Sequence, residues 1–374
     1  MNIGNLEIKF PKLSIGTVTL LIIAAVGLYS AFVRYTQGFG AMTNMSDSRP
    51  WAFWISFDLL VGVAISAGAF VIAGTTHLFH LKKYEPIVRP ALLTGFLGYI
   101  LVSLGLLVDL GQPQRIWHMM IYRNIHSPLF EVGMCVMIYL TVLLLEFIPA
   151  ILEKFGLAHQ APWKWIKNLS IPLIISGFVL STMHQSTLGT LYLIVPHKMH
   201  PLWYTPILPI IFFTSALAVG FGMVIFETVL SHHIFGWDLH EDILQGLGKG
   251  LRVSLVMLLM LKVGDLIYAG EMGLILEGNL QSKSFILENV AGIILPIIIL
   301  TLPRLRVDPK WIFRAGLLTV IGLVLHRFNL SMVGLAGDAY FPHWMEIAAT
   351  AGLFALGLLA FGMVALNVPM HSEH

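Results

Sequence analysis

Residues 203–230 read WYTPILPIIFFTSALAVGFGMVIFETVL, a run of 28 positions in which Glu227 is the single charged side chain. A helix of about 20 apolar residues spans the hydrocarbon core of a bilayer, and in lipid each segment must satisfy its own backbone amides. The chain of 374 residues is 57% hydrophobic and 11% charged, whereas a water-soluble domain carries about a quarter charged residues. The sequence therefore predicts a helical membrane protein, in which polar residues inside apolar runs are the informative ones.

Similar apolar stretches fill almost all of the remaining chain. We expect an all-α integral membrane protein with about ten transmembrane helices, residues 1–374 forming one polytopic membrane domain. The eighth expected span holds Glu288 and Asn289 near one end. The expected spans are 14–34, 52–80, 88–110, 128–152, 168–195, 203–230, 248–270, 284–302, 311–335 and 344–367.

A weak internal repeat relates two sets of four spans. Spans three and seven carry Asp109 and Asp265 near the same end, and spans five and nine carry His184 and His326. The matched spans point the same way, which indicates a parallel repeat of two four-helix bundles; chance similarity among apolar helices is the alternative. The predicted units are a first bundle at 52–195, a second at 203–335, and flanking helices at 14–34 and 344–367.

Lysine and arginine residues are distributed unevenly between the two sides. Fourteen lie in the N-terminus and the even-numbered loops, and six lie in the odd-numbered loops. Because positive loops stay in the cytoplasm, we expect both termini to be cytoplasmic and the odd loops to be periplasmic, in a bacterial inner membrane. The apolar run after Lys9 and Lys12 is too long for a signal peptide, and a net charge of +2 implies no nucleic-acid partner.

The chain has one cysteine, Cys135, inside an expected span. One cysteine makes no disulfide framework and no thiolate-bound iron–sulfur cluster. An iron–sulfur electron carrier would therefore belong to another subunit, and no metal site is predicted.

Ionisable residues inside a membrane are costly and default to functional hypotheses. They gather toward the predicted periplasmic ends of the spans, where carboxylates, imidazoles, guanidinium groups and aromatic rings suit a quinone, whose reduction needs protons. The alternative is structural, with Asp109–Arg115 and Asp265–Arg327 as ion pairs between helices. The candidate quinone-binding residues are Asp109, Arg115, His184, Asp265, Tyr268 and Arg327.

A second group is spread over the depth of the membrane, as a proton relay requires. It consists of Tyr99, Glu131, His184 and Glu227, and separate interhelical hydrogen bonds are the alternative. His184 and His326 also invite a b-type haem. Arg327 follows His326 directly, however, and the usual pair of histidines on one helix is missing, so we predict no haem in this chain.

Three motifs resemble a known family. DLGQPQRIW at 109–117, MHQSTLG at 183–189 and HPLWYTP at 200–206 are similar to the NrfD-like membrane subunits, in particular to their HybB branch. That branch serves periplasmic NiFe uptake hydrogenases of the hydrogenase-2 type. The resemblance covers essentially the whole chain.

The resemblance implies a haem-free menaquinone-binding anchor with its quinone site near the periplasmic side. It implies a periplasmic ferredoxin-like iron–sulfur subunit as partner and, through it, the large and small subunits of a NiFe hydrogenase. Proton translocation is associated with the branch, and Tyr99, Glu131, His184 and Glu227 occupy its proposed path. Related branches serve polysulfide reductase, formate dehydrogenases and complexes of sulfate reducers, so a partner of that kind stays open.

Two other classes remain as alternatives, a secondary transporter and a b-type cytochrome. Aromatic residues in the predicted periplasmic loops suggest where a partner docks, since such side chains suit burial; an interfacial aromatic belt is the alternative. These residues are Trp51, Trp54, Trp117, Trp203 and Tyr204.

Overall fold

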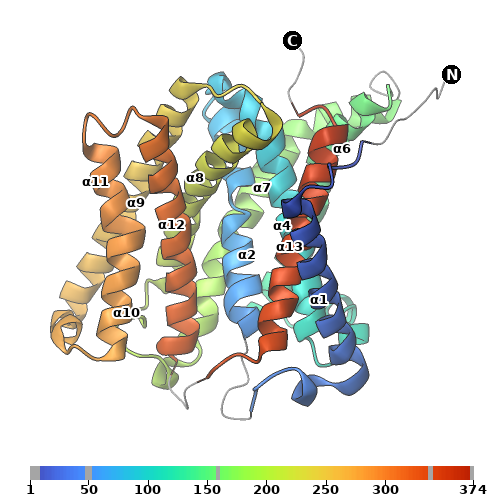
Figure 1. Cartoon of the computed structure of the whole chain (residues 1–374). Helices are drawn as coiled ribbons and strands as arrows, with labels where there is room; N and C mark the ends of the chain where they lie inside the picture. Colours follow the sequence, from blue (N-terminus) through green and yellow to red (C-terminus); the bar gives the residue numbers. More distant parts are fainter. Residues whose placement is uncertain (1–8, 47–52, 157–160, 336–339, 371–374) are drawn as a thin grey trace.

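The computed structural model describes residues 9–46, 53–156, 161–335 and 340–370, and these ranges form a bundle of long, roughly parallel or antiparallel helices (Figure 1). The predicted all-α membrane class is confirmed. Eight of the described helical segments are long and apolar enough to cross a membrane. Helices α7 and α9, of 33 and 29 residues, lie between them and carry more polar side chains.

The helices follow one another in alternating directions. Eight of the described helices are uninterrupted over most of their length, and five of these are α1 (Ile15–Gln37), α4 (Val88–Asp109), α6 (Pro128–Lys154), α7 (Ala161–Leu193) and α13 (Trp344–Asn367). Helices α8 (Leu208–Phe235), α9 (Glu241–Ala269) and α12 (Pro309–Phe328) belong to the second half. Two further spans are composite, α2 (Leu60–Ile65) with α3 (Gly68–Ala73), and α10 (Leu280–Asn289) with α11 (Leu295–Thr301).

Short π-helical turns interrupt the regular hydrogen bonding at four places, and a short helix, α5 (His118–Ile121), lies in a loop. A π turn inserts one residue into a helix and is frequent at functional sites. The turns are η2 (Ile55–Leu59), η3 (Gly74–Leu78), η8 (Val290–Ile294) and η9 (Asn329–Val333).

The observed bounds of the helices differ from the expected ones where turn residues decide them. Helix α8 begins at Leu208, because the preceding residues turn around Thr205, whose hydroxyl accepts from the amide of Ile207 at 3.2 Å. It continues to Phe235 and ends at Gly236, which has a left-handed backbone (φ 71°). Helix α8 therefore extends five residues beyond the expected end at 230.

The first and last helices pack against each other and bring the two ends of the described chain together. A Cβ atom on Gly27 of α1 would lie 2.6 Å from the Cα of Gly352 of α13, so the two glycines permit a close helix crossing. Lys9 and Asn367 exchange hydrogen bonds of 2.9 and 2.7 Å. We call the side of the bundle that holds Lys9 and Asn367 the terminal face, and the opposite side the far face.

Contacts between helices fall into two groups of four spans. In the first group α3 contacts α4 and α7, and α6 contacts both α4 and α7. In the second group α9 contacts α8 and α11, and α12 contacts the same two helices. The two groups meet where α8 packs on α3 and α7, while α13 packs on α4. The origin of this arrangement in a duplication, and the predicted unit boundaries, stay predictions.

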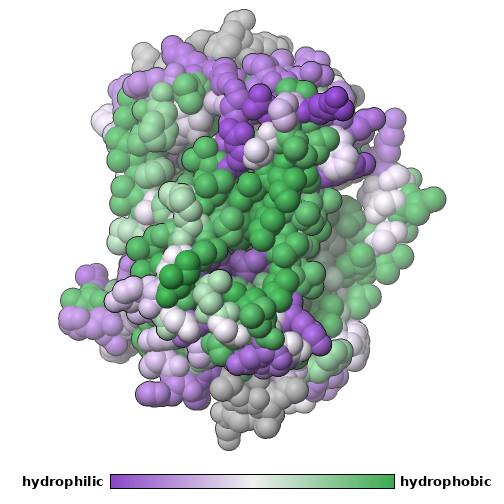
Figure 2. Space-filling view, turned by 90° about the vertical axis from the view of Figure 1, so that its left-hand side faces the viewer, coloured by the Kyte–Doolittle hydropathy of each residue, from purple (hydrophilic) through white to green (hydrophobic). Residues whose placement is uncertain are grey.

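The surface carries a broad belt of hydrophobic side chains between two hydrophilic rims (Figure 2). Large apolar side chains such as Leu28, Met260 and Ile298 are roughly half exposed on it. An exposed apolar belt of this kind matches the lipid core of a membrane.

Candidate functional site

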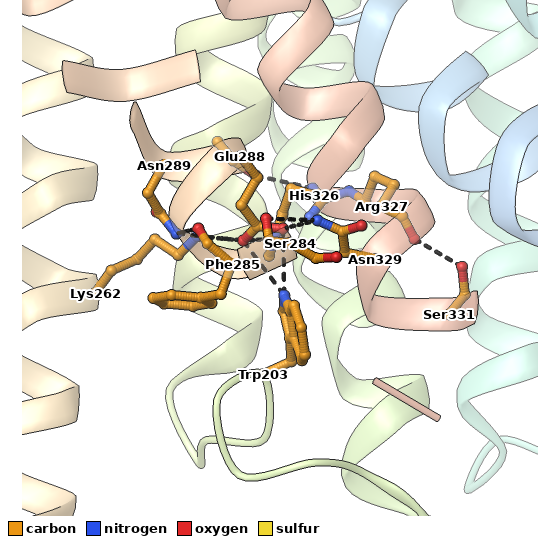
Figure 3. A network of polar contacts seen from close by, with 11 residues as sticks. Trp203, Lys262, Ser284, Phe285, Glu288, Asn289, His326, Arg327, Asn329 and Ser331 are labelled. Atoms are coloured by element: carbon orange, nitrogen blue, oxygen red, sulfur yellow. Dashed lines mark hydrogen bonds and ion pairs between the residues drawn. The ribbon is translucent and has the colours of Figure 1, made fainter. Parts of the chain in front are cut away.

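A buried carboxylate in the second helix group gathers a network of polar side chains (Figure 3). Glu288 is 2% exposed. Its Oε1 lies 3.0 Å from Lys262 Nζ and 3.1 Å from His326 Nδ1. Its Oε2 accepts from Asn329 Nδ2 at 2.8 Å, and Trp203 Nε1 lies 3.3 Å from both oxygens. Each partner offers a donor, which suits a carboxylate that only accepts.

Four separate segments position this network. Glu288 lies near the end of α10, eight residues from its start, and Lys262 lies seven residues before the end of α9. At 1.5 Å per residue both lie about 10–12 Å inside the far face. The π turn η8 follows Glu288 and Asn289, and the π turn η9 follows His326 and Arg327. Asn329, which donates to the carboxylate, is the first residue of η9, and π turns of this kind are frequent at functional sites.

Arg327 lies beside the network but is bound by other groups. Its side chain is fully buried. Nη2 donates to Ser215 Oγ at 2.8 Å, and the guanidinium carbon stands 3.5 Å from the centroid of the Phe212 ring. Nε and Nη1 have no hydrogen-bond partner among the described residues. The cation is thus held by an aromatic face, one hydroxyl and the carbonyl oxygen of Phe212, which accepts from Nη2 at 3.4 Å.

A small cavity adjoins the network. Its volume is about 30 Å³, and its wall includes Lys262, Glu288, His326, Ser215 and Thr319. A space of about 10–15 Å³ on this measure holds a water molecule. Buried charges and room for water therefore occur together in the second helix group.

The first helix group holds a smaller cluster around His184. The Nε2 of His184 lies 2.5 Å from Tyr99 Oη, and its Nδ1 lies 3.0 Å from the carbonyl oxygen of Leu180. The ring of Tyr139 stands edge-on to that of Tyr99, with centroids 4.7 Å apart. The three side chains are fully or almost fully buried. The structure thus brings together Tyr99 and His184, two of the four residues predicted for a proton path.

Glu131 lies close to the same cluster. Its Oε1 accepts a hydrogen bond of 2.7 Å from Thr187 Oγ1, and Thr187 follows His184 by three residues on α7. One helical turn therefore separates Glu131's partner from His184. Three of the four predicted path residues lie in the first helix group, near one another.

Glu227 lies apart from them, on α8. It is 7% exposed, and neither carboxylate oxygen has a hydrogen-bond partner among the described residues. The expected span 203–230 places Glu227 about one turn from its end, and this was wrong, because α8 continues to Phe235 and Glu227 lies about two turns inside the terminal face. Glu227 borders two cavities. The smaller, of about 20 Å³, is also lined by Asp238 and His240 near the terminal face.

The larger cavity has a volume of about 550 Å³ and lies between α1, α2, α4, α8 and α13. Its lining is predominantly apolar, from Leu20, Leu101, Phe226, Leu353 and other residues of these helices. Pockets of about 300–1,000 Å³ with an apolar wall and few polar groups are typical of small-molecule sites.

Asp58, on the π turn η2, lines the same cavity near the far face. It is 6% exposed, and both of its oxygens lack a hydrogen-bond partner among the described residues. A Cβ on Gly105 would lie 3.1 Å from Asp58 Oδ2, so Asp58 packs directly against α4, one turn before Asp109. The cavity therefore carries unpaired carboxylates from two helices, Asp58 toward the far face and Glu227 toward the terminal face.

Asp109 ends α4 and belongs to a polar group that closes this region at the far face. The Nε and Nη2 of Arg34 donate to the carbonyl oxygens of Val108 and Leu110 at 3.0 and 2.6 Å, which places its charge near Asp109. Glu346 is fully buried and accepts from Tyr340 Oη at 2.6 Å.

Tyr340 precedes the first turn of α13 and lies outside the membrane-spanning segments. Burial, together with its hydrogen bond to Glu346, raises its pKa above the usual range.

The remaining predicted quinone residues are dispersed. Asp265 Oδ1 accepts from Thr205 Oγ1 at 2.6 Å, Arg115 is exposed in a loop, and Tyr268 is 94% exposed. Neither alternative ion pair, Asp109–Arg115 or Asp265–Arg327, occurs among the ion pairs of the described residues. The six candidates thus do not form one cluster, and their role in binding stays a prediction.

The aromatic residues predicted to dock a partner also differ in position. Trp54 and Trp203 are 1% and 2% exposed, so their side chains pack inside this chain and are not available to a docked partner. Trp203 is turned inward because its indole N–H meets Glu288. Trp117 is half exposed, and Tyr204 is partly buried. Trp51 lies outside the described residues.

The sequence contained a signal for the Glu288 network that its interpretation did not use. Lys262 and Glu288 are opposite charges, each inside an otherwise apolar run at a similar distance from the far face. Because a lone charge in lipid is costly, two opposite ones at equal depth predict a pair. Asp58 carries a weaker signal, as a single carboxylate inside the expected span 52–80.

The fold and these clusters define a polytopic helical membrane protein with ionisable groups buried between its helices. The chain belongs to the family described as polysulphide reductase, NrfD, which matches residues 41–336. The predicted resemblance is thereby confirmed.

Relatives extend over nearly the full length of the chain. It is 38% identical to a protein of Nitratidesulfovibrio vulgaris over 96% of this chain and 95% of that one. It is 32% identical to the probable Ni/Fe-hydrogenase 2 b-type cytochrome subunit of Escherichia coli, over 90% and 87% of the two chains. It is 29% identical to the integral membrane subunit of a menaquinone reductase of N. vulgaris, over 93% and 89%.

Proposed function

We propose that this chain is the quinone-reactive membrane subunit of a respiratory complex, exchanging electrons between an iron–sulfur subunit at its far face and menaquinone in the bilayer. The observation that carries the proposal is the apolar cavity of about 550 Å³ with Asp58 and Glu227 in its wall. Relatives named as subunits of a hydrogenase and of a menaquinone reductase support the same class of function. In this reading the far face is periplasmic and both termini are cytoplasmic.

The quinone ring would lie at the Asp58 end of the cavity and its apolar tail along the remaining wall. Quinone reduction needs a hydrogen-bond donor or a proton at each carbonyl. Asp58 is buried and without a partner in this wall, and Asp109 lies one turn farther along α4. None of the six predicted quinone residues, Asp109, Arg115, His184, Asp265, Tyr268 and Arg327, lines any of the three cavities described above. Asp109 is retained in the proposal because it lies one turn beyond Gly105, against which Asp58 packs.

Glu227 would supply protons from the terminal face. It stands between the small cavity at Asp238 and His240 and the large cavity. A carboxylate that faces both spaces can take a proton from one and release it to the other. The pair Tyr99–His184 and the pair Glu131–Thr187 then form a separate set of stations toward the far face.

The partner would dock at the far face around α5. Trp117, Met120, Ile121 and Tyr122 are 50–72% exposed there, and an exposed apolar patch in a polar rim is typical of an interaction site. The partner we expect there is a ferredoxin-like iron–sulfur protein. The hydrogenase subunits would bind to this chain through that protein.

The E. coli relative is named a b-type cytochrome subunit, so a b-type haem is the alternative to a haem-free quinone subunit. A bis-histidine haem needs a free imidazole nitrogen on each of two facing helices. Both ring nitrogens of His184 are engaged, with Tyr99 and Leu180, so the pair His184–His326 offers only one free imidazole nitrogen, Nε2 of His326. These residues do not fit a haem, and the proposal is for a haem-free subunit. A visible absorption spectrum of the purified complex tests this part.

The quinone site is tested by filling the cavity. Gly362 lines it, and a Cβ there would meet nothing closer than 4.0 Å, so Gly362→Phe places a ring in the cavity without a backbone clash. Gly264→Phe is the matched control, because a Cβ on Gly264 of α9 has no neighbour within 4 Å and the residue is exposed.

We expect Gly362→Phe to lower menaquinone-dependent turnover at least tenfold while the assembled complex keeps its activity with an artificial acceptor. The Gly264→Phe complex should keep both activities. Full quinone-dependent turnover in a Gly362→Phe complex would contradict the assignment of this cavity.

A further inference from the structure

We propose that His326 is a reversible proton-binding site in the second helix group, with Glu288 as its fixed counter-charge and the adjoining cavity as its source of water. This site lies apart from the 550 Å³ cavity, which His326 does not line. The inference therefore does not depend on whether a quinone binds there.

The hydrogen-bonding pattern fixes which nitrogen is available. Nδ1 of His326 faces Glu288 Oε1 at 3.1 Å (Figure 3). A carboxylate only accepts, so Nδ1 carries the hydrogen and the lone pair of the neutral ring lies on Nε2. Nε2 is buried and has no partner among the described residues. Taking up a proton forms an N–H bond at Nε2 and turns the imidazole into an imidazolium, with the positive charge next to Glu288.

Water can reach this nitrogen locally. His326 lines the cavity of about 30 Å³ together with the hydroxyl residues Ser215 and Thr319. That volume exceeds the roughly 10–15 Å³ that a water molecule needs, and polar walls are the condition for such water to be stable. Both hydroxyls donate to backbone carbonyls of their own helices, Ser215 to Phe212 and Thr319 to Ala315. A water in this cavity would therefore donate to Nε2 and to a hydroxyl oxygen, or carry the proton to Nε2.

Charged and titratable groups on three neighbouring helices and on the helix of His326 itself decide whether the proton is held. Lys262 of α9 and Arg327 of α12 are cations, Glu288 of α10 is the anion, and Tyr192 of α7 faces Arg327. Arg327 binds Ser215 and the Phe212 ring, so the charge of Glu288 is shared by Lys262 and His326.

The Lys262 ammonium and Nδ1 of His326 contact the same oxygen of Glu288, Oε1. Any movement of the Lys262 ammonium away from Oε1 would therefore leave Glu288 free to hold a proton on His326. Proton binding and the position of Lys262 are thus coupled.

A purely structural histidine would need neither a free Nε2 nor a water-sized cavity beside it. Its one bond, from Nδ1 to Glu288, is reproduced by the amide of asparagine, which occupies the place of Nδ1. His326→Asn keeps that hydrogen bond and removes the nitrogen at Nε2. Thr319→Val is the matched control, since Thr319 lines the same cavity but its hydroxyl donates to Ala315 O of its own helix at 2.9 Å.

The test uses the full chain, isotopically labelled with ¹⁵N-histidine and reconstituted in lipid vesicles, with solid-state NMR between pH 5 and 9. The spectrum of His326→Asn is subtracted from that of the unchanged protein to isolate the His326 nitrogens. We expect an Nε2 resonance that moves from the unprotonated to the protonated position as pH falls, present in Thr319→Val and absent from His326→Asn.

An Nε2 resonance that stays in one protonation state across this range would overturn the proposal. If His326→Asn does not fold, His326→Gln serves for the same subtraction, and an unchanging set of buried histidine resonances in the unaltered protein would overturn it as well. Quinone-dependent turnover is not part of the readout, so failure here leaves the proposed quinone site untouched.

Discussion

The ion pair between Lys262 and Glu288 gives the sharpest quantitative prediction for this protein. The two groups are 9% and 1% exposed and their charged atoms lie 3.0 Å apart. At that separation and an effective dielectric constant of about 20, the attraction is about 5.5 kcal/mol before the cost of desolvation is subtracted. Removing one partner of a buried pair leaves the other uncompensated and typically costs about 3–5 kcal/mol.

We therefore expect Lys262→Met and Glu288→Gln each to lower the free energy of unfolding by about 3–5 kcal/mol. The double variant should lose much less than the two single losses combined, because it leaves no lone charge. The difference, the coupling energy, should exceed about 2 kcal/mol, which lies above the roughly 0.6–1.7 kcal/mol measured for neutral hydrogen bonds between membrane helices.

The assay is reversible unfolding in mixed micelles of the four proteins of this cycle, followed by tryptophan fluorescence. The pair Arg89–Glu153, whose side chains are 19% and 32% exposed, is the control, and its coupling should stay below about 1 kcal/mol. A Lys262–Glu288 coupling energy as small as that of the control pair would refute the reasoning that the bilayer makes this pair strong.

Three further outcomes follow from particular residues. Gly322→Ala should destabilise the protein by about 1–3 kcal/mol, because its Cβ would collide with the backbone of Gly292 on the neighbouring span, whereas Gly264→Ala should be neutral in the same unfolding assay. Burial, together with the charge of Asp265, raises the pKa of Glu271 in the loop after α9, so the folded state loses stability as pH rises through that pKa. Glu271→Gln should then raise the melting temperature at pH 7.5 more than at pH 4, and an equal shift at both would argue against the assignment. Glu227→Gln should slow proton uptake from the terminal face in proteoliposomes of the assembled complex, while the exposed Glu241→Gln leaves it unchanged; unaltered uptake in the former would remove Glu227 from the path.

Much of the fold follows from the sequence alone. Long apolar runs determine the number and approximate position of the spans, because a backbone in lipid has no alternative to the helix. The pairing of Tyr99 with His184 was within reach for the same reason, since polar groups at mid-depth have few partners but one another. The family was also recognisable, because its motifs are short and contiguous in the chain.

The grouping of side chains was decided only by the tertiary structure. Sequence position gives the depth of a residue but not the direction in which it points, and one residue on a helix turns that direction by about 100°. Tyr268 is 94% exposed, although it lies only one turn beyond Asp265, whose carboxylate accepts from Thr205. The π turns η8 and η9 follow directly after Asn289 and Phe328, and helix packing brings Lys262 Nζ and His326 Nδ1 to the same oxygen of Glu288.

The same holds for the large cavity and for Asp58 and Glu227 in its wall. Five helices from both halves of the chain border it, and no local pattern reports an empty space between helices that are distant in sequence. The sequence by itself thus determined the membrane class, the spans and the family, because each depends on local chemistry. Which buried charges meet, and where a ligand has room, depended on how the helices rotate and pack against one another.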